Sequence, residues 1–203
     1  TAEQVAQRSL KSICLSYLSL LESSEYLHLA QAQLQQATNM TDAMSALVCI
    51  VNRDYADAQS AITEALADFY QQWQHETLVI NQWLMVQATA ILPGGLDRVK
   101  ALLEHEAFDI KNPNKVRSVI GAFCNSNPIN FHAENGDGYQ FLADKIIALD
   151  KMNPQIASRL LTPLTRWRKY SSLRQASMKS ALESIQATEG LSKDVFEVVS
   201  KSL

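Results

Sequence analysis

Asn112-Pro113-Asn114-Lys115-Val116-Arg117-Ser118 and Asn153-Pro154-Gln155-Ile156-Ala157-Ser158-Arg159 share one pattern of helix start. In each, the Asn can accept a hydrogen bond from a backbone N–H as the N-cap. The Pro then occupies the first helical position, where its missing N–H costs nothing. The two starts, at residues 112 and 153, lie 41 residues apart, within the period of roughly 40–47 residues typical of two-helix solenoid repeats. The pattern therefore predicts a stack of helix pairs.

Each of these helices also carries one arginine in its first two turns, Arg117 in the first and Arg159 in the second. The remaining residues of those turns are mostly apolar, and a lone cation is costly in apolar surroundings. We expect both arginines to turn inward, toward the same surface. Two such cations predict a positively charged surface on the stack, and not a domain with a structural role alone.

The composition sets limits on the class of protein. At 203 residues the chain is long enough for one large domain, and its 18 basic and 21 acidic side chains argue against a nucleic-acid or membrane-surface partner. No apolar run approaches the ~18 residues that a membrane span needs. Cys14, Cys49 and Cys124 all lie in apolar helical patterns. We interpret them as reduced core thiols, which indicates a cytoplasmic protein.

Apolar residues recur at helical spacing along nearly the whole chain. Asn39, with Asp42 three residues on, predicts another capped helix start. Strand-like alternation does not persist, so we predict an all-α fold, a curved stack of antiparallel helix pairs like the armadillo/HEAT α-α superhelix. The first expected buried stripe consists of Leu10, Ile13, Cys14, Tyr17, Leu18 and Leu21.

Three features are expected to interrupt the helices. Pro93-Gly94-Gly95 is the clearest break, and the polar stretch 125–138 contains Asn127-Pro128 and Gly136-Asp137-Gly138. Pro163 should bend or shorten the helix in which it lies.

Motifs for catalysis or metal binding are absent from the sequence. His75-Glu76 and His105-Glu106 both lack the second histidine that a helical His-Glu-x-x-His zinc pair needs. His28 and His132 have no partner at ligand spacing, and Gly136-Asp137-Gly138 lacks the further oxygen ligands of a calcium loop. There is no Gly-x-Ser-x-Gly elbow, P-loop or Gly-x-Gly-x-x-Gly. We therefore predict no catalytic residue, metal ligand or cofactor site in this chain.

Several segments resemble the C-terminal helical domain of bacterial aminopeptidase N, the alanyl aminopeptidase of the gluzincin zinc metallopeptidases. The resemblance extends over essentially the whole chain. The segments are 112–123, Ser126-Asn-Pro, Phe131-His-Ala-Glu, Gly136-Asp-Gly-Tyr139, 153–159, Asn39-Met-Thr-Asp-Ala-Met44 and Leu191-Ser-Lys-Asp-Val-Phe196.

The resemblance implies that residues 1–203 are a single helical domain, the C-terminal part of a longer peptidase. In that family the helical domain caps the active site and closes an internal chamber. The zinc ligands, the Gly-x-Met-Glu-Asn motif and the catalytic tyrosine belong to a preceding catalytic domain, so zinc is expected there and not in this chain. The implied partners are that domain and, through the full-length enzyme, a peptide substrate. This chain alone is expected to be inactive.

The resemblance also implies that Arg117, Gln155 and Arg159 line the substrate chamber. Gln155 and Arg159 are four residues apart, on one face of a helix, which agrees with this assignment. An alternative is that the arginines only pair with acidic neighbours or cap carbonyls. At the level of the whole chain, the alternatives are a free-standing helical-repeat module for protein interaction and an unrelated all-helical enzyme. The latter is disfavoured because no cluster of an acid, a base and a nucleophile emerges.

Overall fold

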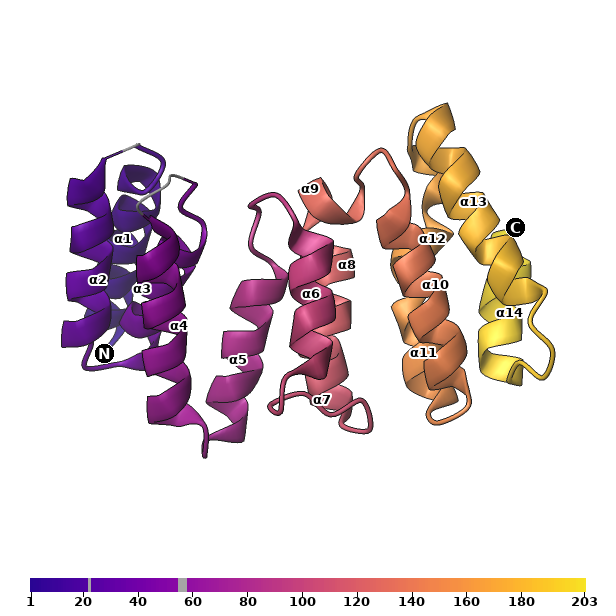
Figure 1. The fold of residues 1–203 in the computed structure, drawn as a ribbon, viewed down its shortest axis with the longest axis horizontal. Coiled ribbons are helices and arrows are strands. Elements are labelled where there is room, and N and C mark those ends of the chain that lie inside the picture. Colours follow the sequence, from indigo (N-terminus) through magenta and orange to yellow (C-terminus); the bar gives the residue numbers. More distant parts are fainter. Residues whose placement is uncertain (22, 55–57) are drawn as a thin grey trace. The chain divides into compact units, whose positions relative to one another are not determined.

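The structure is a computed structural model that describes residues 1–21, 23–54 and 58–203. Every regular element in those ranges is a helix, as Figure 1 shows, so the predicted all-α fold is confirmed. The contacts divide the chain into two compact units, unit 1 from Thr1 to Leu92 and unit 2 from Pro93 to Leu203. The expectation that residues 1–203 form a single domain stays a prediction.

Unit 1 is organised around its third helix. Its helices are α1 (Ala2–Leu18), α2 (Ser24–Gln36), α3 (Met40–Val51), α4 (Ala58–Trp73) and α5 (Thr77–Ala88). Helix α3 contacts the other four, and its Leu47 and Ile50 are completely buried. It begins as the sequence predicts, because the side chain of Asn39 accepts a hydrogen bond from the backbone N–H of Asp42 at 3.0 Å. The core of unit 1 is therefore built on α3.

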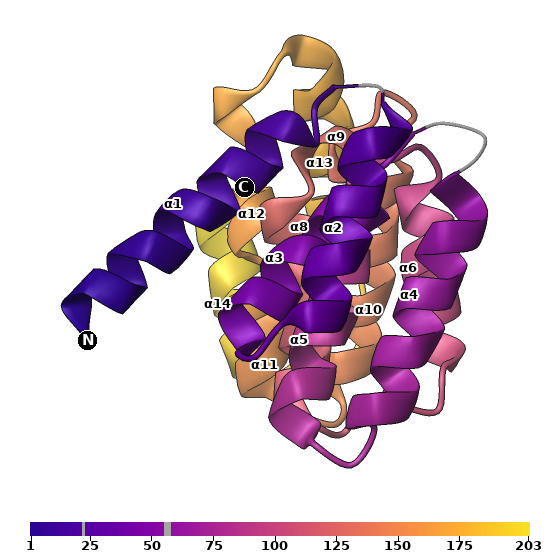
Figure 2. The same ribbon diagram turned by 90° about the vertical axis from the view of Figure 1, so that its left-hand side faces the viewer.

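Helix α1 contradicts the predicted buried stripe. Leu15 is its one buried residue, whereas Leu10 and Tyr17 are 65% and 70% exposed. Cys14 is exposed as well, so its assignment to the core is wrong, while Cys49 and Cys124 are buried as expected. Figure 2 shows the N-terminal half of α1 extending away from α2 and α3. Periodicity identifies residues that share a helix face, but it does not establish that another element covers that face.

Unit 2 is arranged around α10 and combines long helices with several short ones. They are α6 (Gly95–Glu104), α7 (Pro113–Val116), the π-helix η1 (Arg117–Gly121), α8 (Ala122–Ser126), α9 (Pro128–Phe131), α10 (Asp137–Asp150), α11 (Pro154–Leu160), α12 (Thr162–Thr165), the 3₁₀-helix η2 (Trp167–Lys169), α13 (Ser172–Gln186) and α14 (Lys193–Ser202). Helix α10 packs against α11 and α13, and α14 packs against both of these. Phe123 meets Phe131 and Phe141 edge to face in the core.

The predicted helix starts and breaks of unit 2 agree with the structure. Asn112 and Asn153 cap α7 and α11 through their side-chain oxygens, with a proline in the first turn of each helix. Pro163 lies at the start of α12, which separates this segment from α11. The stretch 125–138 was predicted to be non-helical, and this is wrong in part because it contains α9. Asn127 caps α9 by accepting from the N–H of Asn130 at 3.3 Å.

Close backbone packing explains why residue 138, at the end of the stretch 125–138, is a glycine. A Cβ on Gly138 would lie 2.4 Å from the carbonyl oxygen of Phe131. The start of α10 can therefore approach the end of α9 only without a side chain at this position. A polar contact fixes the other end of α10, where the buried Asp150 carboxylate accepts from the backbone N–H and the hydroxyl of Ser192.

Candidate functional site

The helical segment 113–126 that carries Arg117 changes its winding at that residue. One α-helical turn, α7, leads into the five-residue π-helix η1, which begins at Arg117, and α8 continues from it. Val116, Val119 and Ile120 are fully buried. A π-helical turn is rare and occurs frequently at functional sites. The local backbone therefore singles out the position of Arg117 independently of its charge.

Arg117 is exposed rather than enclosed by the apolar residues of its helix. Val116 takes the core position beside it, and the guanidinium avoids the cost of burial by remaining in solvent. Its Nη1 donates to Oδ1 of Asn114 at 2.6 Å. Within the described residues it has no acidic partner at ion-pair distance. Arg117 thus presents an unneutralised cation at the surface of unit 2.

The neighbouring cation on this helix has another role. Nζ of Lys115 donates a hydrogen bond to the backbone carbonyl of Ala107, and burial lowers the pKa of Lys115. Lys115 therefore ties α7 to the segment that follows α6. Arg117 is left as the exposed cation of this helix.

Helix α11 presents the other two predicted residues on its outer face. Gln155 and Arg159 are exposed one turn apart, whereas Ile156, Ala157 and Leu160 are buried. In the described part of the chain, the Arg159 guanidinium has neither a hydrogen bond nor an ion pair. That Arg117 and Arg159 turn toward the same surface stays a prediction. The side chains of Gln155 and Arg159 are available to a ligand or to another polypeptide segment.

Helices η1 and α11 meet at Gly121. A Cβ at this glycine would lie 3.7 Å from Cδ2 of Leu160 and 3.8 Å from Cβ of Arg117. Leu160, which follows Arg159 in the chain, therefore lies close to the turn that carries Arg117. The fold brings together the two helices that carry the predicted residues, although no hydrogen bond joins the three predicted side chains within the described residues.

The residues that the structure describes do not form a zinc site. No three His, Cys, Asp or Glu side chains in the described ranges come together as metal ligands. His105 uses Nδ1 to accept from the N–H of Ala107 at 3.0 Å. Burial raises the pKa values of the Cys49 and Cys124 thiols, so neither is an activated thiolate. We therefore assign no step of metal chemistry to this chain.

A polar cluster that the sequence did not reveal surrounds His132. Its Nδ1 lies 2.8 Å from the hydroxyl of Tyr139, its Nε2 lies 3.1 Å from the hydroxyl of Tyr170, and Nε of Arg174 donates to its backbone carbonyl at 3.0 Å. One nitrogen of a neutral imidazole donates and the other accepts, so the two phenols play opposite roles. Burial, and then the Arg174 charge, lower the pKa of His132. The cluster joins the α9–α10 segment to η2 and α13.

Sequence comparison places the chain among known proteins. Residues 1–203 match a family described as a domain of unknown function (DUF3458_C) with ARM repeats. The chain is 41% identical over 202 residues to aminopeptidase N of Escherichia coli strain K12, covering 99% of this chain and 23% of that protein. It is 38% identical over 208 residues to aminopeptidase N of Haemophilus influenzae, covering 100% and 23%.

A solved structure of another aminopeptidase is also similar to this chain. The crystal structure of Legionella pneumophila aminopeptidase A in complex with aspartic acid superposes with a TM-score of 0.90 at 37% identity, covering 98% of this chain and 23% of that one.

The class defined by the fold is therefore the all-helical ARM-repeat proteins, which form α-α superhelices. Within that class, the chain belongs to the family of ARM-repeat domains that includes the C-terminal domain of aminopeptidase N, and the resemblance seen in the sequence is confirmed. The chain spans about a quarter of the length of these relatives. Among the helices of the described residues, none has the length and hydropathy needed to cross a bilayer.

Proposed function

We propose that this chain is the C-terminal domain of a zinc-dependent aminopeptidase that removes N-terminal amino acids from peptides. The observation that carries the proposal is the match of the whole chain, at 41% and 38% identity, to two aminopeptidase N proteins of which it covers 23%. The zinc and the catalytic residues of such a protein lie outside these 203 residues in this proposal. In this proposal the chain itself helps to bind the substrate and to enclose the active site.

In this proposal the domain caps the active site, and Arg117, Gln155 and Arg159 line the substrate chamber. A guanidinium can hold peptide carbonyls, or a C-terminal carboxylate in a bidentate manner. The amide of Gln155 can donate to and accept from a peptide backbone without reading its side chains. The exposure of all three side chains and the approach of their helices at Gly121 support this role. Their contribution is to position the substrate tail, while bond cleavage occurs elsewhere.

The proposed partner within the full-length protein is the catalytic domain. The exposed stripe on α1, which includes Leu10, Ile13 and Tyr17, supports it because an apolar helix face of this kind marks an interaction surface. The other proposed partner is the peptide substrate, and no nucleic acid or membrane is involved. We place the protein in the cytoplasm, which the three free cysteines support.

The test compares the full-length protein with this chain on an amino-acid anilide. We expect the full-length protein to release the anilide product, to lose activity with a chelator and to regain it with zinc. The 203-residue chain alone should show no turnover. Chelator-resistant turnover by the purified chain, or a full-length protein without aminopeptidase activity, would contradict the proposal. The second outcome would favour the alternative, a helical-repeat module for protein interaction.

A further inference from the structure

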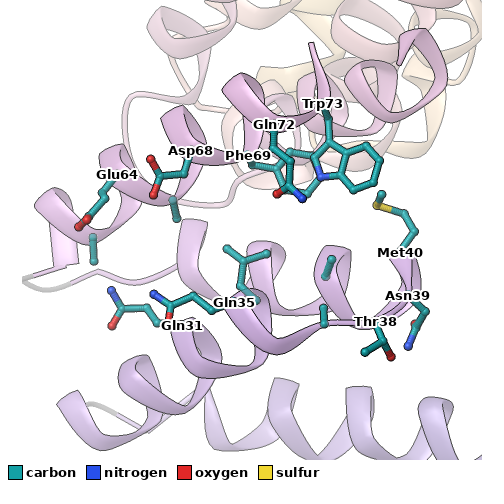
Figure 3. A pocket seen from close by; sticks show the side chains of 15 residues that line it. Gln31, Gln35, Thr38, Asn39, Met40, Glu64, Asp68, Phe69, Gln72 and Trp73 are labelled. Atoms are coloured by element: carbon teal, nitrogen blue, oxygen red, sulfur yellow. The ribbon is translucent and has the colours of Figure 1, made fainter. Parts of the chain in front are cut away.

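Unit 1 contains a cleft between α2, the start of α3, and α4. Its volume of about 580 Å³ falls within the range of small-ligand sites. Figure 3 shows Gln31 and Gln35 of α2 on one wall and Glu64 and Asp68 of α4 on the opposite wall. All of the lining residues belong to unit 1, whereas the three residues of the proposed substrate chamber belong to unit 2.

One end of this cleft carries uncompensated negative charge. Glu64 and Asp68 are exposed one helical turn apart, a spacing at which two carboxylates repel each other. No lining residue is basic. Within the described residues, neither carboxylate has an ion-pair or hydrogen-bond partner. A cation placed between them would relieve this repulsion.

The other end of the cleft is aromatic and apolar. Phe69 and Trp73 lie on α4 with ring centroids 6.3 Å apart. Figure 3 shows the thioether of Met40 near the indole of Trp73. Such surfaces accept apolar side chains, and an aromatic face also attracts a nearby cation. The cleft therefore joins a site for a cation to a site for an apolar group.

We propose that this cleft binds a short peptide segment in which a lysine or arginine is next to an apolar residue. The ammonium or guanidinium group lies between Glu64 and Asp68, and the apolar side chain lies against Phe69 and Trp73. The amides of Gln31 and Gln35 bind the backbone of the peptide. Unit 1 as a whole attracts such a ligand because its sequence holds 9 acidic and only 3 basic side chains.

The experiment titrates the 203-residue chain with acetyl-Leu-Lys-Leu-amide by calorimetry. The acetyl group removes the free N-terminus, so binding does not depend on aminopeptidase activity. We expect saturable binding that weakens as salt is added. The matched peptide with norleucine in place of lysine keeps the carbon chain without the charge and should bind about tenfold more weakly. Equal binding of the two peptides, or no saturable binding of the lysine peptide, would overturn the proposal.

Variants of the chain locate the site. The double variant Glu64→Gln, Asp68→Asn should lose about tenfold in affinity for the lysine peptide, and Trp73→Leu about threefold to tenfold. Glu76→Gln is the matched control, because Glu76 is an exposed carboxylate of unit 1 outside the cleft, and it should change affinity less than about twofold. Circular dichroism checks that each variant is folded. Wild-type affinity in the folded double variant would overturn the proposal, as would an equal loss in the control.

Discussion

Unit 1 and unit 2 have the same helical class but opposite charge. Residues 1–92 hold 3 basic and 9 acidic side chains, whereas residues 93–203 hold 15 and 12. The acidic unit contains the cleft with Glu64 and Asp68, and the basic unit contains the exposed cations Arg117 and Arg159. The whole chain has nearly equal numbers of basic and acidic side chains, so its net charge does not reveal the opposite charges of the two units. Charge must therefore be assessed by unit before partners are excluded.

In both units, polar side chains join helices that are separate in the sequence. In unit 2, Asp150 binds Ser192, His132 lies between Tyr139 and Tyr170, and further polar contacts reach the last residues of the chain. In unit 1, Lys11 of α1 pairs with Asp42 of α3 at 3.0 Å, and Gln33 of α2 donates to the hydroxyl of Ser45 at 2.9 Å, while the apolar stripe of α1 is exposed. We expect the largest change in the free energy of unfolding when a buried side chain of α3 is truncated. A smaller change is expected when a side chain is added at a close backbone contact in unit 2. The smallest is the pH dependence that arises from the His132 cluster.

The largest effect is expected from Leu47→Ala in α3. Leu47 is fully buried, so the variant should lower the free energy of unfolding by about 2–5 kcal/mol. The matched control is Leu10→Ala on the exposed stripe of α1, which should cost less than about 0.5 kcal/mol. Urea unfolding of both variants measures the difference. Similar losses would show that α1 is covered in solution.

The next largest effect is expected at Gly138 in unit 2, where the backbone at the start of α10 lies close to the end of α9. Gly138→Ala should lower the free energy of unfolding by about 1–3 kcal/mol, because its Cβ would clash with a backbone carbonyl that cannot rotate away. Gly121→Ala is the control, since its Cβ would meet neighbours only at ordinary contact distances. It should gain or lose no more than about 1 kcal/mol. An unaffected Gly138→Ala variant would contradict the packing of α9 on α10.

The smallest effect is a dependence of stability on pH. Burial and Arg174 lower the pKa of His132 in the folded chain. When the pH falls below about 6.5, the usual histidine value, the unfolded chain therefore binds a proton more readily than the folded chain. The His132 contribution to stability is fully present above that pH and is lost as the pH falls from there through the lower pKa of His132 in the folded chain.

Urea unfolding of the wild type and of His132→Asn at several pH values between 5 and 8 tests this sign. The wild type should lose stability toward low pH more steeply than the variant. His75→Asn, at an exposed position, is the control and should keep the wild-type slope. A wild type that becomes more stable toward pH 5, relative to His132→Asn, would contradict the assignment.

The sequence predicted much of the fold because its signals are local. The caps at Asn39, Asn112 and Asn153 depend on residues within three positions of each cap, and all three form as expected. The buried stripe of α1 failed because burial depends on elements far away in the chain. The helix α9 was missed because its length of only four residues leaves no periodic pattern.

The same contrast between local signals and long-range contacts applies to the candidate sites. The sequence placed Gln155 and Arg159 on one helix face, but it did not predict the exposure of the arginines or the π-helical turn at Arg117. The His132 cluster joins residues up to 42 positions apart, and no spacing in the sequence brings Arg174 to His132. The cleft in unit 1 likewise depends on the packing of three helices.

The measurement that most directly tests the substrate-chamber role uses Arg159→Ala and Arg117→Ala in the full-length protein. A charge-assisted hydrogen bond to the substrate contributes about 1–3 kcal/mol, so kcat/KM for peptides should fall by roughly tenfold to a hundredfold. A single-residue anilide, too short to reach the arginines, should be hardly affected. Arg166→Ala, at another exposed arginine of unit 2, serves as the control and should leave both substrates unchanged. Equal losses on the peptide and the anilide would contradict the substrate role and assign the arginines to maintenance of the fold.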